Sequence, residues 1–343
     1  METEKANDAS KYILDISESK KYECEADHKE YTLYRVKRVG GEKGGWISST
    51  MNLANNGKAW VGGESVVCGH ARVFDSATVT GNCEISCSAK VGGNAKVEGN
   101  CKVTDNACVA WDAKVSGNVA ISGSAKVSGT LEGDVNVGHF AEIVGVVKDK
   151  VTVKDHAAVY GTVSGKGLVY GGSTIYGEVK DSFIGGSVYV WDTGKVDGNS
   201  HIDGSVVVEG AVSESMIGGA VRVGKDASVK KSTIFGASVV FGKVESAKIS
   251  CASSVYGAVG GGENILGAVH VGYNGDFKGN VDGAVYINSK VENVTVAGNM
   301  NATASISGGE AKNCVVDAVV ERMSGGNEVT SIHDKMKEAG MTG

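Results

Sequence analysis

Histidine is the side chain in this sequence best suited to proton transfer near neutral pH. The chain has seven histidines, and five of them lie in its long repetitive part: His70, His139, His156, His201 and His270. A general base must be held within hydrogen-bond reach of its substrate. His70 and His156 occupy corner positions of the repeat, whereas His201 and His270 lie between two inward residues and face solvent. None of the five lies on a long excursion from the repeat, which favours surface histidines over catalytic ones.

The sequence gives little indication of a metal site or of a nucleotide-binding site. None of the eight cysteines forms a CxxC pair, and the Cys83-x-x-x-Cys87 spacing alone is a weak metal signal. Glycine-rich pieces such as VGGGENILG lack the lysine of a phosphate-binding loop. Cys83 and Cys101 occupy a position that neighbouring repeats give to Ala, so we interpret them as small buried residues. We therefore expect no metal, no cofactor and reduced thiols.

Much of the chain consists of a six-residue repeat, and the structure that this repeat forms must position the functional side chains within it. From Ala59 to Thr130 it runs for twelve units, each with a small residue, an aliphatic residue two places later, and then Gly with Asn or Asp. Residues two apart in a strand point to the same side, which we take as the core. Gly and Asn readily adopt positive φ, so each short strand is expected to end in a sharp corner.

This repeat resembles that of the hexapeptide-repeat left-handed β-helix proteins, in which three six-residue sides make a triangular coil of eighteen residues. The resemblance implies an all-β fold, a left-handed parallel β-helix solenoid. Beyond Thr130 the steps between inward residues become four, six and six, which predicts coils of about sixteen residues. The inward residues of the short side would then form a column: Leu131, Val147, Val163, Val179, Val196, Val212, Val229, Val244, Val259, Phe277 and Val291.

The two ends of the chain depart from the repeat. Residues 1–58 contain the strand-like pieces YILDIS, KYECEA and YTLYRVKRV, and we expect them to form a small N-terminal β cap. Residues 59–130 would form the regular coils and residues 131–309 the shorter ones. Residues 310–343 would form a C-terminal cap and tail, in which TSIHDKMKEAG predicts a short helix.

The N-terminal passage sharpens the resemblance. A strand-rich start, a GGW and a Trp-Val pair that leads into regular hexapeptides are similar to the YdcK-like subgroup of bacterial and phage-borne proteins, which are usually labelled acetyltransferases. The wider family implies homotrimers in which a His in an intersubunit cleft deprotonates the acceptor of an acyl group. On that alternative, acetyl-CoA would be the cofactor, and His156 and His201 would be the candidate bases. The family's carbonic anhydrase branch needs three converging His ligands, and no trio here has such spacing.

Two outward patterns could bind a partner. Arg72, Lys90 and Lys126 share a face of the regular coils, with Cys108 between them. We interpret this basic ladder mainly as charge that keeps a flat sheet from associating, with a phosphate or an acidic glycan as the alternative ligand.

The second pattern is aromatic. Tyr160, Tyr176 and Trp191 follow inward aliphatic residues and fall on one face of successive coils, and Phe241 with Tyr256 resumes this column. Such a strip predicts an internal aromatic ladder or the contact surface of an oligomer, because aromatic residues often anchor protein interfaces. A platform for sugar rings is the alternative interpretation.

Composition sets the remaining limits. The 34 basic and 40 acidic residues give a net charge of −6, which does not predict a nucleic-acid partner. With 51 Gly and no Pro, the chain fits many tight corners joined by hydrogen-bonded strands. No stretch predicts a signal peptide or a membrane span, so we expect a cytoplasmic or virion-associated protein that does not bind membranes.

The sequence therefore predicts a non-catalytic scaffold. It would present its surface to a protein partner or to further copies of itself, a homotrimer being the form that the resemblance implies, in a phage particle or a bacterial assembly. A CoA-dependent acyltransferase is the first alternative and a glycan-binding solenoid the second.

Overall fold

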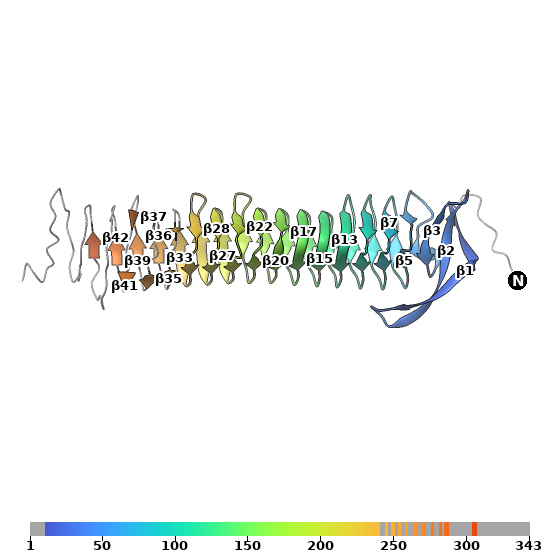
Figure 1. The fold of residues 1–343 in the computed structure, drawn as a ribbon, viewed down its shortest axis with the longest axis horizontal. Coiled ribbons are helices and arrows are strands. Elements are labelled where there is room, and N and C mark those ends of the chain that lie inside the picture. Colours follow the sequence, from blue (N-terminus) through green and yellow to red (C-terminus); the bar gives the residue numbers. More distant parts are fainter. Residues whose placement is uncertain are drawn as a thin grey trace, which may run out of the picture. The chain divides into compact units, whose positions relative to one another are not determined.

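A computed structural model describes residues 11–240 and, beyond them, the backbone of further short strands up to residue 306; side chains are described for residues 11–237. The chain divides into two compact units, Met1–Gly172 (unit 1) and Ser173–Gly343 (unit 2). Among the described elements all are strands except one 3-10 turn, η1 (Thr50–Asn52). The strands stack in parallel, which confirms the predicted all-β solenoid (Figure 1). Its left-handed sense stays a prediction, and the expected C-terminal helix lies outside the described residues.

Unit 1 begins with an antiparallel hairpin of β1 (Tyr12–Cys24) and β2 (Lys29–Arg38). The next strand, β3 (Lys43–Ile47), pairs antiparallel with β2 and parallel with the first coil. A polar contact fastens the hairpin to the coil after that one: the Tyr22 hydroxyl donates to Oε2 of the buried Glu84 at 2.7 Å. Burial and this bond together raise the pKa of Tyr22. The hairpin is thus tied to the coils by non-repeating side chains.

The coils of unit 1 place their strands in three columns. The first contains β4 (Trp60–Val61), β7 (Thr78–Gly81), β10 (Lys96–Gly99) and β19 (Thr162–Ser164). The second contains β5 (Val66–Val67), β8 (Glu84–Ile85), β11 (Lys102–Val103) and β20 (Lys166–Val169). The third contains β6 (Arg72–Val73), β9 (Lys90–Val91), β12 (Cys108–Val109), β14 (Lys126–Val127), β16 (Glu142–Ile143) and β18 (Ala158–Val159). Three longer strands serve both the first and second columns, namely β13 (Lys114–Ile121), β15 (Thr130–Val137) and β17 (Val146–Val153).

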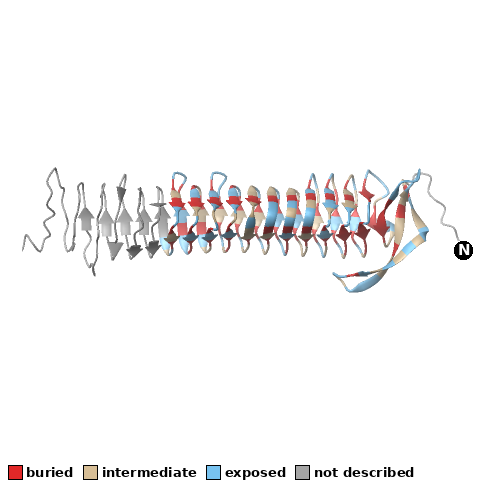
Figure 2. Ribbon diagram, in the orientation of Figure 1, coloured by how far each residue is buried: buried red, intermediate tan, exposed pale blue. Residues whose placement is uncertain are grey.

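The strand register changes where the sequence period changes. Val61 pairs with Val79 and Val79 with Val97, a repeat of 18 residues, whereas Leu131 pairs with Val147 at a repeat of 16. The inward residues are almost completely buried throughout, and Figure 2 shows them as buried stripes along the strands. The predicted inward column of unit 1 is therefore confirmed.

The shortened corner depends on glycine. A Cβ on Gly129 would lie 2.0 Å from the carbonyl oxygen of Gly145, and a Cβ on Gly145 would lie 2.0 Å from that of Gly161. Real Cβ atoms do not approach carbonyl oxygens so closely, so this corner requires a residue without a side chain. Gly177, which follows Tyr176, is limited in the same way, because a Cβ there would lie 2.2 Å from the carbonyl oxygen of Gly194.

The other corners use Asp and Asn to join successive coils. The carboxylates of Asp75, Asp105 and Asp149 each accept a hydrogen bond from a glycine amide one coil further on. All three residues have positive φ. In a separate corner column, Asn82 donates its amide to Asn100, which donates to Asn118. The polar corner residues of the repeat thus satisfy backbone donors and one another.

Unit 2 repeats the same arrangement in its described strands. Its first column contains β22 (Glu178–Lys180), β25 (Lys195–Asp197), β28 (Ala211–Ser213) and β31 (Ser228–Lys230), continued by β34 (Val244–Glu245), β37 (Ala258–Val259) and β40 (Asp276–Phe277). Its second contains β23 (Phe183–Ile184), β26 (His201–Ile202), β29 (Met216–Ile217), β32 (Thr233–Ile234), β35 (Lys248–Ser250), β38 (Asn264–Leu266) and β41 (Val281–Asp282). Its third contains β21 (Thr174–Ile175), β24 (Tyr189–Val190), β27 (Ser205–Val208), β30 (Ala220–Val223), β33 (Ala237–Val240), β36 (Ser253–Val255), β39 (Val269–Val271), β42 (Val285–Ile287) and β43 (Ala304–Ile306).

The coils of unit 2 are less uniform than the sequence predicts. Val179 pairs with Val196 and Val196 with Val212, repeats of 17 and 16 residues, and the column continues through Val229, Val244, Val259 and Phe277. The predicted column is confirmed this far, and Val291 lies outside the described residues. The small inward position changes from Ala to Ser, and the hydroxyl of Ser200 donates to Asp197 O at 2.6 Å and accepts from Ser215 N at 3.1 Å.

Candidate functional site

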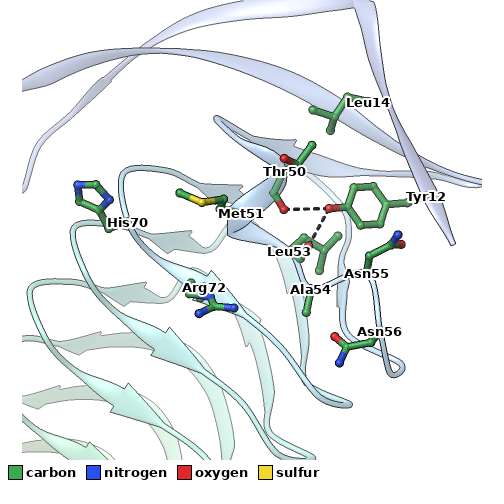
Figure 3. A pocket seen from close by; sticks show the side chains of 10 residues that line it. All are labelled: Tyr12, Leu14, Thr50, Met51, Leu53, Ala54, Asn55, Asn56, His70 and Arg72. Atoms are coloured by element: carbon green, nitrogen blue, oxygen red, sulfur yellow. Dashed lines mark hydrogen bonds between the residues drawn. The ribbon is translucent and has the colours of Figure 1, made fainter. Parts of the chain in front are cut away.

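A pocket of about 630 Å³ lies in unit 1 between β1 and the third column (Figure 3). Its walls are formed by Tyr12, Leu14, Thr50, Met51, Leu53, Ala54, Asn55, Asn56, His70 and Arg72. None of these lining residues is acidic, and Arg72 is a permanent cation. Arg72 is a member of the predicted basic ladder, but the sequence contained no signal that it would line a pocket, because Tyr12 and residues 50–56 lie outside the repeat.

The wall on the hairpin side is fixed by Tyr12. This residue is only 5% exposed, and its hydroxyl donates to the carbonyl oxygens of Thr50 at 3.1 Å and Leu53 at 2.7 Å (Figure 3). Burial raises the pKa of Tyr12, so the phenol keeps its proton at neutral pH. The backbone amide of Lys11 also donates to Asn55 Oδ1 at 2.9 Å. β1 and the 50–56 segment are thereby held together.

The opposite wall is fixed by Asn52, which is 1% exposed. Its Oδ1 accepts from the backbone amides of Ser48 and Ser49 at 3.1 and 2.8 Å, and its Nδ2 donates to the carbonyl oxygens of Gly69 and Ala71 at 3.0 and 2.8 Å. Gly69 and Ala71 flank His70 in the chain. Asn52 therefore positions the corner that carries His70 and the start of the strand that carries Arg72.

The basic ladder lies on the third column of unit 1 as predicted. In the strand register, Arg72 lies beside Lys90, Lys90 beside Cys108, and Cys108 beside Lys126. Lys126 in turn lies beside Glu142 of the next strand. Arg72, Lys90 and Lys126 are exposed. Within the described part of the chain, no carboxylate lies within ion-pair distance of these three side chains.

A second set of hydrogen-bonded residues lies in one corner column of unit 1, with one residue on each of three consecutive coils. His139 Nδ1 lies 2.7 Å from Asp155 Oδ1, and Asp155 Oδ2 accepts from the Gly171 amide at 3.2 Å. The hydrogen bond from the Gly171 amide has the larger effect and the one with His139 the smaller, and together they hold the pKa of Asp155 below its usual value. His156, one of the two candidate bases, is exposed and stacks on Phe140 with ring centroids 5.0 Å apart. Among the histidines whose side chains are described, the one with an orienting carboxylate is thus His139, and the 16-residue spacing from His139 to Asp155 was the available signal.

His201, the other candidate base, lies in unit 2. Its ring is exposed and stacks on Phe183 of the adjacent strand at 6.1 Å. No described carboxylate pairs with it. The structure therefore separates His156 and His201 into different units and gives each an aromatic neighbour instead of an acid.

The aromatic residues of unit 2 form a cluster that the sequence only partly predicts. Tyr176 and Trp191 follow the paired residues Ile175 and Val190, as expected, and are 41% and 44% exposed. Their rings are joined through Tyr189, whose centroid lies 5.4 Å from Tyr176 and 4.8 Å from Trp191. We call Tyr176, Tyr189 and Trp191 the aromatic cluster.

The remaining aromatic candidates are Tyr160, Phe241 and Tyr256. Tyr160 lies in unit 1, 38% exposed after the inward Val159. Phe241 and Tyr256 lie outside the described residues. After Trp191 the outward position passes to Glu209, which pairs with Arg222 at 2.6 Å. The cluster therefore ends at Trp191.

Metal coordination and membrane insertion find no support in the described residues. No group of three His, Cys, Asp or Glu side chains between residues 11 and 237 is arranged to hold a metal ion. Within the same part of the chain, no helix is long and apolar enough to cross a bilayer. Cys83 and Cys101 are buried, as interpreted from the repeat.

No protein-family model matches the chain, and no curated protein matches it.

Proposed function

We propose that the protein is a non-catalytic scaffold that presents ordered side-chain arrays to other protein chains. Its inward residues stay in register through successive coils of each unit, so its outward side chains repeat at the inter-strand spacing of about 4.8 Å. A surface held by continuous parallel pairing suits a role in which shape and spacing are used, in a phage or bacterial assembly.

The observation that carries this proposal is the aromatic cluster. Tyr176, Tyr189 and Trp191 pack on one another, yet Tyr176 and Trp191 each keep about two fifths of their surface in solvent. Large exposed aromatic side chains are costly to leave in water and commonly anchor protein interfaces. The proposed occupant is a second copy of this chain.

The experiment replaces Tyr176 and Trp191 together by Ser and measures mass by light scattering, with thermal stability measured beside it. If the cluster is an interface between copies, the variant has a lower mass than the wild type at the same concentration. The double variant Thr174→Ser/Thr233→Ser, on the same unit, is the control and should keep the wild-type mass. A wild type that is already monomeric at the highest concentration measured contradicts self-association.

The same variant separates the other interpretations of the cluster. Lower stability with unchanged mass would indicate an internal ladder. Loss of binding on a glycan array, with mass and stability intact, would indicate a glycan-binding solenoid.

A CoA-dependent acyltransferase is the second candidate, and the His139–Asp155 pair favours it. A carboxylate on one ring nitrogen orients the imidazole and leaves the other nitrogen to accept a proton. Titration of the full chain with acetyl-CoA tests this function directly. Saturable binding, with turnover lost in His139→Ala and kept in His201→Ala, would establish an enzyme and overturn the scaffold proposal.

A further inference from the structure

We propose that the pocket between β1 and the third column of unit 1 binds a small oxyanion, a carboxylate or a phosphate, through Arg72 with His70 beside it. The site is independent of the aromatic cluster, which belongs to unit 2.

The charge of the pocket favours an anion. Its lining contains Arg72 and no acidic residue, and His70 is exposed at its rim. Lys90, paired with Arg72 on the adjacent strand, adds a second cation at about 4.8 Å of strand separation. Two neighbouring cations without a carboxylate repel each other, and a bound anion would relieve that repulsion.

Three other cations of unit 1 are paired with carboxylates. Arg35 pairs with Glu64 at 2.9 Å, Arg38 with Glu42 at 3.2 Å, and Lys102 with Glu25 at 2.5 Å. Arg72 differs from these in that no described carboxylate reaches it. Its guanidinium fork matches the oxygens of a carboxylate or phosphate.

The walls are ordered before any ligand binds. Tyr12 is anchored to two carbonyl oxygens and Asn52 to the carbonyl oxygens on either side of His70. Pre-organised walls reduce the entropy lost on binding. Leu14 and Met51 add apolar surface to the same pocket, and Met51 is 67% exposed. The favoured ligand therefore carries its charged group on an apolar or ring-shaped body.

The test follows the Arg72 side-chain Nε–Hε signal of the ¹⁵N-labelled full chain by NMR. That signal is assigned by its loss in Arg72→Lys. The probes are benzoate and inorganic phosphate, titrated separately to about 10 mM. A saturable shift with benzoate and not phosphate identifies a carboxylate site with an apolar subsite, and the reverse result identifies a phosphate site. If neither probe gives a saturable shift, the proposal is overturned.

The variants test whether the pocket or the whole ladder binds. Arg72→Ala and His70→Gln are followed through backbone amide signals of residues 50–56. Arg72→Ala should weaken binding at least about tenfold, and Arg72→Lys should weaken it less.

Lys126→Ala is the matched control. It removes an exposed cation from the same face three strand separations away, about 14 Å, beyond the Debye length of about 8 Å at physiological ionic strength. Binding in Lys126→Ala should change less than about twofold, and an equal loss in Lys126→Ala and Arg72→Ala would show diffuse charge attraction and sink the pocket site. Unchanged thermal midpoints show that the variants are folded.

Discussion

His139 Nδ1 lies 2.7 Å from Asp155 Oδ1, on the next coil of unit 1. Asp155 has a φ of 63°, and its second carboxylate oxygen accepts the amide of Gly171. One carboxylate thus connects three successive coils. An earlier Asp of the same corner column, Asp105, makes the equivalent bond to the Gly123 amide at 2.8 Å with a φ of 57°, but has no His partner.

This relationship predicts a pH-dependent contribution to stability. The Gly171 amide and His139 lower the folded-state pKa of Asp155 below its unfolded value of about 3.9. The contribution is therefore fully present above about pH 4 and is lost as pH falls through the folded pKa. Asp155→Asn should lower the free energy of unfolding at about pH 7, and the difference from wild type should shrink towards about pH 2.

Chemical denaturation at both pH values measures this effect. Asn tolerates the positive φ, so the substitution mainly removes the charge. Asp105→Asn is the matched control, because it keeps the same backbone conformation and lacks the His. It should show a smaller pH-dependent difference, and a difference for Asp155→Asn that does not vary with pH would contradict the assigned cause.

The short corner predicts a strong position dependence for Gly→Ala substitutions. Gly145→Ala would place a Cβ 2.0 Å from Gly161 O and should destabilise unit 1 by about 2 to 3 kcal/mol through overpacking. Gly138→Ala, by contrast, would meet only Ser122 Oγ at 3.5 Å. It should be neutral or stabilising by up to about 1 kcal/mol, because Ala restricts the unfolded chain. The thermal unfolding midpoints of the two variants are compared with each other. Equal midpoints would argue against the close contact with the Gly161 carbonyl oxygen.

The inward column predicts the effect of a buried charge. Val97 is 1% exposed and pairs with Val79 and Val115 on the coils before and after it. Val97→Asp would bury a carboxylate without a partner and should cost about 3 to 5 kcal/mol. The control is Lys96→Asp, one residue earlier on the exposed side of the same strand. Wild-type stability in Val97→Asp would contradict the inward assignment.

Asn52 is expected to be essential for the order of the pocket. Asn52→Ala leaves the Ser49 amide and the carbonyl oxygens of Gly69 and Ala71 without their partner and should cost about 2 to 4 kcal/mol. Asn52→Asp keeps the acceptor but turns an oxygen towards the carbonyl oxygens of Gly69 and Ala71, so it should not restore stability. Asn56→Ala, which removes an exposed side chain of the same pocket, should stay within about 0.5 kcal/mol of wild type. Rescue by Asp would show that the bonds to Gly69 and Ala71 contribute little.

Much of the fold was determined by the sequence alone. The alternation of a small residue and an aliphatic residue is local, so it specifies which side of each strand faces the core. Identical positions on successive coils then pair with one another, which is why the column from Leu131 to Val163 could be written down before the structure. The change from 18 to 16 residues was readable for the same reason, since each coil must return to the same inward position.

The tertiary structure decided where the non-repeating side chains meet. Tyr12 and Asn52 reach the first coil through the hairpin and the η1 turn, whose docking follows no period, so the pocket at Arg72 could not be predicted. Tyr189 joins Tyr176 to Trp191 because its ring contacts both of them, and the pairing of His139 with Asp155 depends on rotamers as well as register. A periodic sequence specifies backbone register, whereas the contacts among its exceptional residues depend on side-chain conformations that only packing selects.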